Sequence, residues 1–262
     1  MPEVRNWDGR EYDRVSAPME ALALAVLERL QLAGDETVLD AGCGSGRVTE
    51  AIIARVPRGR VIALDQSASM VAAARERLAR FLDGASTNGD AAAVEVVQGD
   101  LLELELRERV DAVFSTATFH WIKDHGLLFE RLRAALRPGG RLVAQCGGEG
   151  NISKLRAMAQ EVAAREEFHE HFAGFRPPWN YAAPDVTHER LLAAGFASAD
   201  CWLAPAPKEP EHPRAFLAEI TFGPHVQHLP DELRDPFIDG VLELAGEPVV
   251  VDYVRLNIDA VA

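Results

Sequence analysis

The chain has 262 residues, of which 48% are hydrophobic and 26% charged, so it is long enough to bury a large core. These values exclude intrinsic disorder, collagen and a small disulfide-stapled scaffold. With 27 Lys plus Arg against 41 Asp plus Glu, the net charge is −14, which would repel nucleic acid and anionic membrane surfaces. We therefore expect neither of them as a partner.

The sequence also carries signals about location and redox state. The first fourteen residues mix both charges, and no later segment has the ~18 uncharged apolar residues of a membrane span, so we expect a cytoplasmic protein. The three cysteines, Cys43, Cys146 and Cys201, are scattered and form no CxxC pair. This spacing predicts reduced thiols rather than a disulfide or zinc framework.

An opening helix is predicted over residues 16–32, because apolar residues recur there at helical spacing. Short apolar or β-branched runs, typical of buried strands, follow at residues 37–41, 61–64, 94–97, 110–115 and 141–146. Helical patterns separate them at residues 47–56, 68–81 and 124–137, and a loop rich in Gly, Ser, Asn and Asp covers 83–92. This alternation predicts a doubly wound, mostly parallel α/β sheet with helices on both faces.

The second half of the chain has a less regular pattern. Helices are predicted at residues 151–172, 187–194, 214–222 and 231–244, and strands at 196–203 and 249–258. We expect this half to add two strands to the sheet and inserted helices that cover a pocket.

A glycine cluster follows the first predicted strand and opens a helix. Gly42, Gly44 and Gly46 would let a ligand lie directly against the backbone, next to free amides at a helix start. The dinucleotide fingerprint GxGxxG fails because Arg47 or Thr49 stands where it needs a small residue. The tighter GxGxG spacing instead favours a nucleoside without a pyrophosphate, such as S-adenosylmethionine.

Two aspartates follow the next predicted strands. Asp65 can accept both ribose hydroxyls, although alone it could equally be a helix cap or a surface carboxylate. Asp100 could accept the adenine amino group while Leu101 and Met70 sandwich the ring, and a simple turn aspartate is the alternative.

The fourth strand leads into an uncharged aromatic stretch, Phe119-His120-Trp121, at the sheet edge where open α/β folds bind ligands. We predict that Phe119 contacts the substrate and that His120 and Trp121 are catalytic. A core Phe and Trp with a surface His is the alternative. Farther on, Arg176, Trp179 and Tyr181 could bind an anionic substrate, although a surface salt bridge would explain the arginine equally well.

Five segments, VLDAGCGSG, LDQS, QGDL, FSTATFHWI and LRPGGRLVAQ, resemble in order and spacing the motifs of class I S-adenosylmethionine-dependent methyltransferases, over residues 37–146. The resemblance implies a Rossmann-like sheet of seven strands with an antiparallel last strand, and S-adenosylmethionine as cofactor. It also implies that the cofactor contacts Asp40, Gln66, Ser115 and Thr116, and that a leader over residues 7–16 brings Tyr12 to it.

Within that family the whole chain is similar to the trans-aconitate type, which shares a W-x-x-x-x-Y leader, an aromatic-Trp loop and a helical insertion. It departs from that type in the loop 116–121 and at Arg47, where the type usually has Asn. We expect a single domain made of leader helices that close on the cofactor (1–34), a cofactor-binding core (35–147), and further strands with a helical lid (148–262).

A methyl group on a sulfonium has a good leaving group, so the enzyme mainly aligns the reactants in a water-poor pocket. We expect a small carboxylated acceptor that His120 orients or neutralises. With a hydroxyl, amine or carbon acceptor, His120 could instead remove a proton. The rival functions are a nicotinamide oxidoreductase and a non-catalytic nucleoside-binding protein on the same fold.

Some features have no predicted role in catalysis. His169, His171, His225 and His228 have spacings that could suit a metal, but a third ligand type is missing, and we expect no metal. We expect a monomer or a homodimer.

Overall fold

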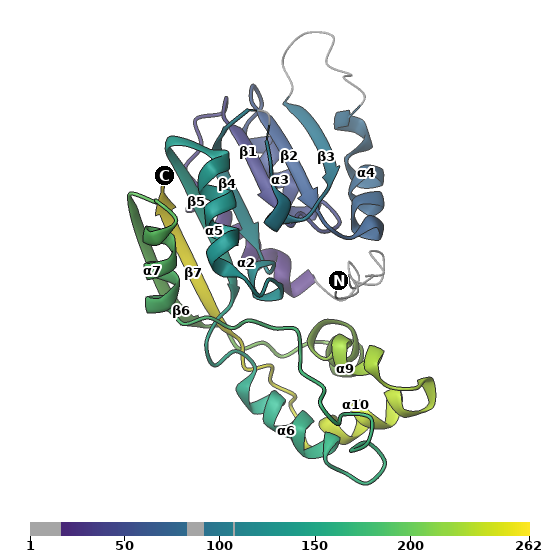
Figure 1. Cartoon of the computed structure of the whole chain (residues 1–262). Coiled ribbons are helices and arrows are strands. Elements are labelled where there is room, and N and C mark those ends of the chain that lie inside the picture. Colours follow the sequence, from purple (N-terminus) through teal and green to yellow (C-terminus); the bar gives the residue numbers. More distant parts are fainter. Residues whose placement is uncertain (1–16, 83–91, 107) are drawn as a thin grey trace.

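The computed structural model describes residues 17–82, 92–106 and 108–262. Seven strands form one sheet in the order β3-β2-β1-β4-β5-β7-β6 (Figure 1). All neighbours from β3 to β5 are parallel, whereas β7 runs antiparallel to both β5 and β6. The strands are β1 (Thr37–Ala41), β2 (Arg60–Asp65), β3 (Ala93–Gln98), β4 (Val110–Thr116), β5 (Leu136–Gly147), β6 (Ser198–Pro205) and β7 (Val254–Val261). The predicted sheet is confirmed.

The helices are α2 (Ala17–Leu27), α3 (Arg47–Arg55), α4 (Ala68–Leu82), α5 (His125–Ala135), α6 (Ser153–Ala163), α7 (Pro184–Ala193), α8 (Pro213–Phe216), α9 (Gly223–His228) and α10 (Asp231–Ala245). Two short 3-10 helices, η1 (Leu101–Glu103) and η2 (Phe119–Trp121), follow β3 and β4, and a π-helical turn, η3 (Leu217–Thr221), continues α8. None of the helices in the described ranges combines the length and apolar character that crossing a bilayer would need.

Side chains of successive residues in the central strands point alternately to the two faces of the sheet, and each face is covered by a hydrophobic layer. On β2, Val61 and Ala63 pack with α2, α3 and α4, whereas Ile62 and Leu64 pack on the other face with α5 and α7. Successive side chains of a strand point to opposite faces, so a continuously apolar strand needs a cover on both sides. This explains why uninterrupted apolar runs were a reliable strand signal here.

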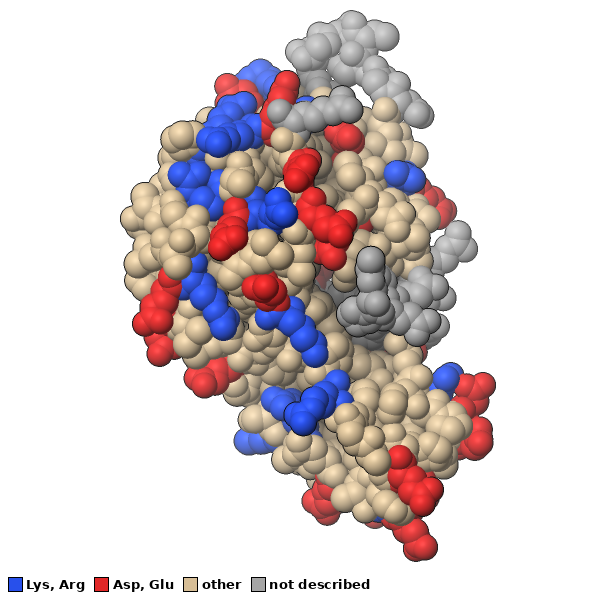
Figure 2. All heavy atoms as spheres, in the orientation of Figure 1, with Lys and Arg blue, Asp and Glu red and all other residues tan. Residues whose placement is uncertain are grey.

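A third hydrophobic cluster lies apart from the sheet. It is built from α6, α8, α9 and α10 together with residues 249–253, and its largest buried side chains include Phe168, Phe222 and Phe237. These helices lie below the sheet in the view of Figure 1. We call them the helical part. On the face shown in Figure 2, acidic and basic side chains are interspersed over both parts.

Several predicted boundaries are wrong. The predicted helix 151–172 ends at Ala163, and turns follow in which Phe168 and Phe172 pack against Phe237. The apolar spacing in this stretch reflects packing against another element rather than a continuing helix. The last strand begins at Val254 instead of 249, because the residues before it belong to the core of the helical part.

Two further boundaries differ. Helix α5 ends at Ala135, and β5 already includes Pro138-Gly139-Gly140. The predicted helix 214–222 is split into α8 and η3. The loop residues 83–91 and the leader residues 1–16, including Tyr12, lie outside the described residues.

Candidate functional site

The three glycines in the loop between β1 and α3 have different surroundings. All three have positive φ angles, +83° at Gly42, +55° at Gly44 and +80° at Gly46, which favour glycine. A Cβ on Gly42 would lie 2.2 Å from Thr118 Oγ1, and one on Gly46 would press on Leu78 and Ala74 of α4. A Cβ on Gly44 would meet nothing within 4 Å. Gly44 is therefore the glycine that faces open space.

Asp65, at the end of β2, holds this loop in place. Its Oδ2 accepts a hydrogen bond from the Gly44 N–H at 3.0 Å, and its Oδ1 accepts one from the Ser67 N–H at 2.9 Å. Burial raises the pKa of Asp65, although these backbone donors oppose the shift. Each carboxylate oxygen still has a free lone pair, so the side chain can also accept ribose hydroxyls. The next residue, Gln66, is exposed and accepts through its carbonyl from Gln98.

Asp40 is buried under the same loop. Its Oδ2 accepts a hydrogen bond from Thr49 Oγ1 at 2.6 Å. Burial raises the pKa of Asp40 to about 7, and the nearby Asp65 adds to the rise while the Thr49 hydrogen bond opposes it. The carboxyl is thus poised between its two protonation states near neutral pH.

The residues predicted to hold adenine lie after β2 and β3. Met70 and Leu101 are buried, which suits an apolar face for a ring. Asp100 is exposed, and its Oδ1 caps η1 by accepting from the Leu102 N–H at 2.9 Å. A second oxygen remains available to an amino group.

A cavity of about 90 Å³ lies between the glycine loop and the ends of β4, β5 and β7. Its lining includes Asp40, Gly42, Gly44, Thr116 and Arg255. In sheets of this order, ligands bind where the strand order reverses, which here is between β1 and β4. Ser115 is buried within the sheet, where its hydroxyl donates to the Ala41 carbonyl at 2.7 Å.

Four aromatic side chains gather near Gly147 at the carboxyl end of β5, and we call them the aromatic cluster: His120, Trp121, Trp179 and Tyr181. The ring centroids of His120 lie 5.1 Å from Trp121 and 5.9 Å from Tyr181, and Trp179 stacks on Tyr181 at 5.7 Å. The structure thus brings the predicted catalytic residues together with two of the three residues from the distant Arg-aromatic segment.

Asn180 and Gly147 allow the segment that carries Trp179 and Tyr181 to pack against His120 and Trp121. The backbone N–H of Asn180 donates to the His120 carbonyl at 2.8 Å, and its side-chain amide donates to the Ile122 and Lys123 carbonyls. A Cβ on Gly147 would lie 2.6 Å from Tyr181 Cε1, so only glycine leaves room for that ring. Neither residue was predicted, because their partners are distant in the sequence.

His120 is buried and neutral. Burial and, to a lesser degree, the cationic side chain of Arg255 together lower its pKa to about 3. Nδ1 accepts the Gly147 N–H at 3.3 Å. The proton of the neutral ring therefore sits on Nε2, so His120 offers a hydrogen-bond donor rather than a free basic nitrogen.

Two predicted substrate residues are not part of the cluster. Phe119 is 1% exposed and packs edge-to-face on Phe129 in the core, at 6.1 Å between centroids. Arg176 is exposed to solvent. Phe119 is therefore a core residue, as the alternative reading of that stretch proposed, and Arg176 lies outside the cluster.

Sequence reasoning did not single out Arg255, which lines the cavity from β7. It is 4% exposed, and its Nε has no hydrogen-bond partner within the described chain. An arginine in a final strand has no motif around it, so only the strand pairing reveals it. That pairing sets Arg255 opposite Gly147.

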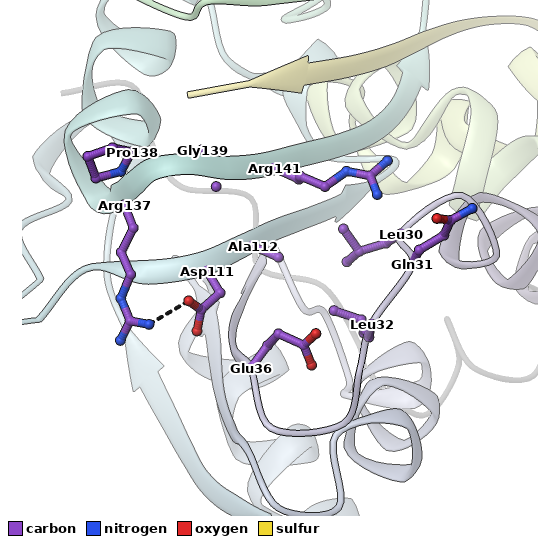
Figure 3. A pocket seen from close by; sticks show the side chains of 11 residues that line it. Leu30, Gln31, Leu32, Glu36, Asp111, Ala112, Arg137, Pro138, Gly139 and Arg141 are labelled. Atoms are coloured by element: carbon purple, nitrogen blue, oxygen red, sulfur yellow. Dashed lines mark hydrogen bonds and ion pairs between the residues drawn. The ribbon is translucent and has the colours of Figure 1, made fainter.

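A larger cavity of about 210 Å³ lies at the opposite, amino edge of the sheet (Figure 3). Arg137, Asp111 and Glu36 are among its lining residues, and the Arg137 side chain extends toward Asp111 and pairs with it. Parallel sheets of this type bind ligands at their carboxyl edge. We therefore place the functional site at the smaller cavity.

The histidines with metal-like spacing do not converge. His225 is buried among aromatic rings, including Trp179 at 5.5 Å, and burial lowers its pKa to about 4. His228 meets the His171 carbonyl. In the described ranges no three His, Cys, Asp or Glu side chains form a group that could hold a metal ion. The three cysteines are free thiols.

Comparison with known proteins agrees with this geometry. A family model described as a methyltransferase domain matches residues 38–140. A trans-aconitate 2-methyltransferase of Paracidovorax citrulli is 30% identical over 266 residues, which cover 98% of this chain and 90% of that protein. The chain belongs to the class I S-adenosylmethionine-dependent methyltransferases. Within them it resembles the trans-aconitate type.

Two solved structures share the fold. The YcgJ protein of Bacillus subtilis has a TM-score of 0.61 at 16% identity, over 93% of this chain and 98% of that one. A phosphoethanolamine N-methyltransferase of Haemonchus contortus, solved with S-adenosylhomocysteine, has a TM-score of 0.60 at 20% identity, over 97% of this methyltransferase and 56% of that chain. S-adenosylmethionine is the cofactor, and the open cradle at Gly44 beside the Asp65 carboxylate suits it.

Proposed function

We propose that this methyltransferase transfers the methyl group of S-adenosylmethionine to a carboxylate oxygen of a small acceptor. The observation that carries the proposal is the burial of the titratable side chains in and beside the aromatic cluster. Burial keeps His120 neutral, with its pKa near 3, and raises the pKa of the Tyr181 phenol. Burial likewise raises the pKa of the nearby Cys146 thiol to about 12. None of these three groups is a suitable base near neutral pH.

A carboxylate acceptor needs no base, because it is already an anion at neutral pH. A hydroxyl or an ammonium group would first have to lose a proton. When bound, S-adenosylmethionine supplies a methyl group on a cationic sulfur; the C–S bond breaks, its electron pair stays on sulfur as a neutral thioether, and a C–O bond forms. The relatives named trans-aconitate 2-methyltransferase support the same acceptor class.

The residues of this chain have distinct parts in the proposed reaction. Gly44 leaves space for the cofactor, Asp65 accepts its ribose hydroxyls, and Met70 with Leu101 flanks the adenine. His120 donates through Nε2 to the acceptor and orients it. Trp121, Trp179 and Tyr181 surround the reacting atoms and exclude water, which strengthens the hydrogen bonds inside.

We further propose that the helical part serves as the lid. Trp179 connects it to the cluster, since its ring lies 6.5 Å from Trp121 and 5.5 Å from His225 of α9. A cover built by helices α6 and α9 on one side and the sheet edge on the other would close the acceptor off from solvent.

The test is a methyl-transfer screen with radiolabelled cofactor against trans-aconitate, other small carboxylic acids, phenols and amines. We expect product only with carboxylic acids, and mild alkali should release its label as volatile methanol, because methyl esters hydrolyse under conditions that ethers and methylamines survive. Alkali-stable product, or turnover with phenols or amines alone, would refute the proposal. The absence of any S-adenosylhomocysteine formation would favour a non-catalytic role.

A further inference from the structure

Arg255 is the most unusual charged residue in the described part of the chain. It is 4% exposed, and no other Arg or Lys in the described ranges is buried to this degree. Burying a guanidinium costs several kcal/mol unless a partner compensates it. Its position therefore calls for a physical explanation.

The described protein supplies no anionic partner for this side chain. Some half-buried arginines of this acidic chain form ion pairs, for example Arg29 with Asp259 and Arg47 with Glu20. Arg255 instead lies over the Tyr253 ring, 4.8 Å from its centroid, and its Nε is unpartnered. A buried donor without a partner is expected at a site that receives a ligand.

The surroundings of Arg255 are those of the proposed acceptor. It is paired across β5 and β7 with Gly147, whose N–H holds His120. Its charge acts on His120 and on Tyr181, and it lines the same cavity as Gly44. An anion between the glycine loop and the aromatic cluster would thus lie within reach of the guanidinium.

A second arginine lies farther from the sheet. Arg156, on α6, is half-buried with its guanidinium 5.8 Å from the Tyr181 ring centroid, and it also acts electrostatically on His225. The described residues form no ion pair with it. Tyr181 is therefore within the electrostatic reach of two arginines that lack carboxylate partners.

We propose that Arg255 is the specificity-determining residue that binds a carboxylate of the acceptor, and that Arg156 binds a second carboxylate of the same molecule. The proposal rests on the proposed function, and it selects a di- or tricarboxylate over a monocarboxylate. Guanidinium groups bind carboxylates through two parallel hydrogen bonds, which fixes orientation as well as charge. One carboxylate is thereby left for methylation.

The carboxylate on Arg255 could also come from the methionine end of the cofactor, and binding measurements separate the two sources. Titration calorimetry would measure the Kd of S-adenosylhomocysteine alone, and then the Kd of trans-aconitate with S-adenosylhomocysteine present. For Arg255→Met we expect trans-aconitate to bind at least ~10-fold more weakly, while S-adenosylhomocysteine binds within ~2-fold of wild type. The melting temperature should stay level or rise, because an unpaired buried charge is removed.

Three variants sharpen the test. Arg255→Lys keeps the charge but not the paired hydrogen bonds, and should recover only part of the affinity. Arg156→Met should weaken the binding of trans-aconitate but not the binding of a monocarboxylate such as crotonate. Arg137→Met removes the same charge at the opposite cavity and serves as the control, with unchanged affinities expected.

Each contrary outcome has a distinct meaning. Weaker S-adenosylhomocysteine binding with unchanged trans-aconitate binding in Arg255→Met would assign this arginine to the cofactor and overturn the inference. A lower melting temperature with both affinities unchanged would make Arg255 structural. If wild type binds trans-aconitate through Arg255 but forms no ester, the proposed function fails while the inference stands.

Discussion

Gly44 is the position where the backbone of the cofactor loop is open to a ligand. A Cβ there meets no protein atom within 4 Å, so a larger side chain would occupy the space that the cofactor needs. We predict that Gly44→Val weakens S-adenosylhomocysteine binding by at least ~100-fold, since the branched side chain fills the cradle. The φ of +55° adds a strain of roughly 1–2 kcal/mol.

Gly174 is the matched control for that strain. It has a φ of +78° and, like Gly44, no atom within 4 Å of an added Cβ, but it lies in a turn of the helical part. Gly174→Val should lower the melting temperature about as much as Gly44→Val does while leaving the cofactor Kd unchanged. Equal loss of cofactor affinity in both variants would mean that strain, not the cradle, controls binding.

Asp40 makes stability depend on pH. Its pKa is raised to about 7 by burial, above the ordinary value that it has when unfolded. Between pH ~4 and ~7 the unfolded chain loses this proton while the folded chain keeps it, so wild-type stability falls as pH rises through this range. The amide introduced by Asp40→Asn does not ionise, so this variant escapes the loss of stability. Its free energy of unfolding relative to that of wild type should rise by roughly 2–3 kcal/mol from pH 5 to pH 8.

Urea unfolding of the cofactor-free protein at both pH values measures this effect. Thr49→Val should change the pH dependence in the opposite direction, because it removes the hydroxyl that donates to Asp40 and stabilises its ionised form. It should therefore lose more stability at pH 8 than at pH 5. An advantage of Asp40→Asn that is the same at both pH values would contradict the raised pKa.

At the level of single residues, sequence reasoning succeeded where a motif is local. The glycine loop and Asp65 lie in one strand-loop-helix unit and the following strand, so their spacing predicted their meeting. Arg255 had no such signal, since its neighbours Gly147 and His120 reach it through an antiparallel pairing of distant strands. Arg176 was favoured for its aromatic neighbours, but it is exposed.

Among the elements, the segment of residues 175–181 is the one that joins the two halves of the site. Asn180 fixes it with three hydrogen bonds to carbonyls of residues 120–123. We predict that Asn180→Ala, which keeps the backbone bond but loses both side-chain bonds, raises the acceptor KM several-fold while the cofactor Kd stays unchanged. Steady-state kinetics and calorimetry measure the two constants.

Asn180→Asp is the companion variant, because a carboxylate cannot donate to the Ile122 and Lys123 carbonyls. It should be at least as impaired as Asn180→Ala. An unchanged KM in both variants would show that the segment holds its place without the side chain.

Strands were easier to predict than helices for a physical reason. The strands of the parallel sheet are buried on both faces, so they appear in the sequence as uninterrupted apolar runs. Helix α6 ends at Ala163 although apolar residues continue to Phe172, and those later residues pack on Phe237 of α10. Local spacing cannot separate a helix face from a turn that another element holds in place.

In the whole molecule, three hydrophobic clusters are arranged as two sheet layers and a separate core in the helical part. The cofactor loop belongs to the sheet layers, whereas Trp179 and His225 pack with the helical core. Because separate cores open as separate cooperative units, the two ligands should protect different amides from hydrogen exchange.

Hydrogen exchange followed by mass spectrometry tests this prediction on the intact protein. S-adenosylhomocysteine alone should slow exchange in residues 42–50 and 65–71 and leave the helical part unchanged. Adding trans-aconitate should then slow exchange in residues 175–181 and in α9, because the acceptor bridges the aromatic cluster and the helical core. Residues 30–32 and 137–141, which line the cavity at the amino edge, are the internal control. If trans-aconitate slows exchange in these control residues, the acceptor binds at the wrong edge of the sheet for methyl transfer. If S-adenosylhomocysteine alone slows exchange equally in the sheet and in the helical part, the two parts open as one unit.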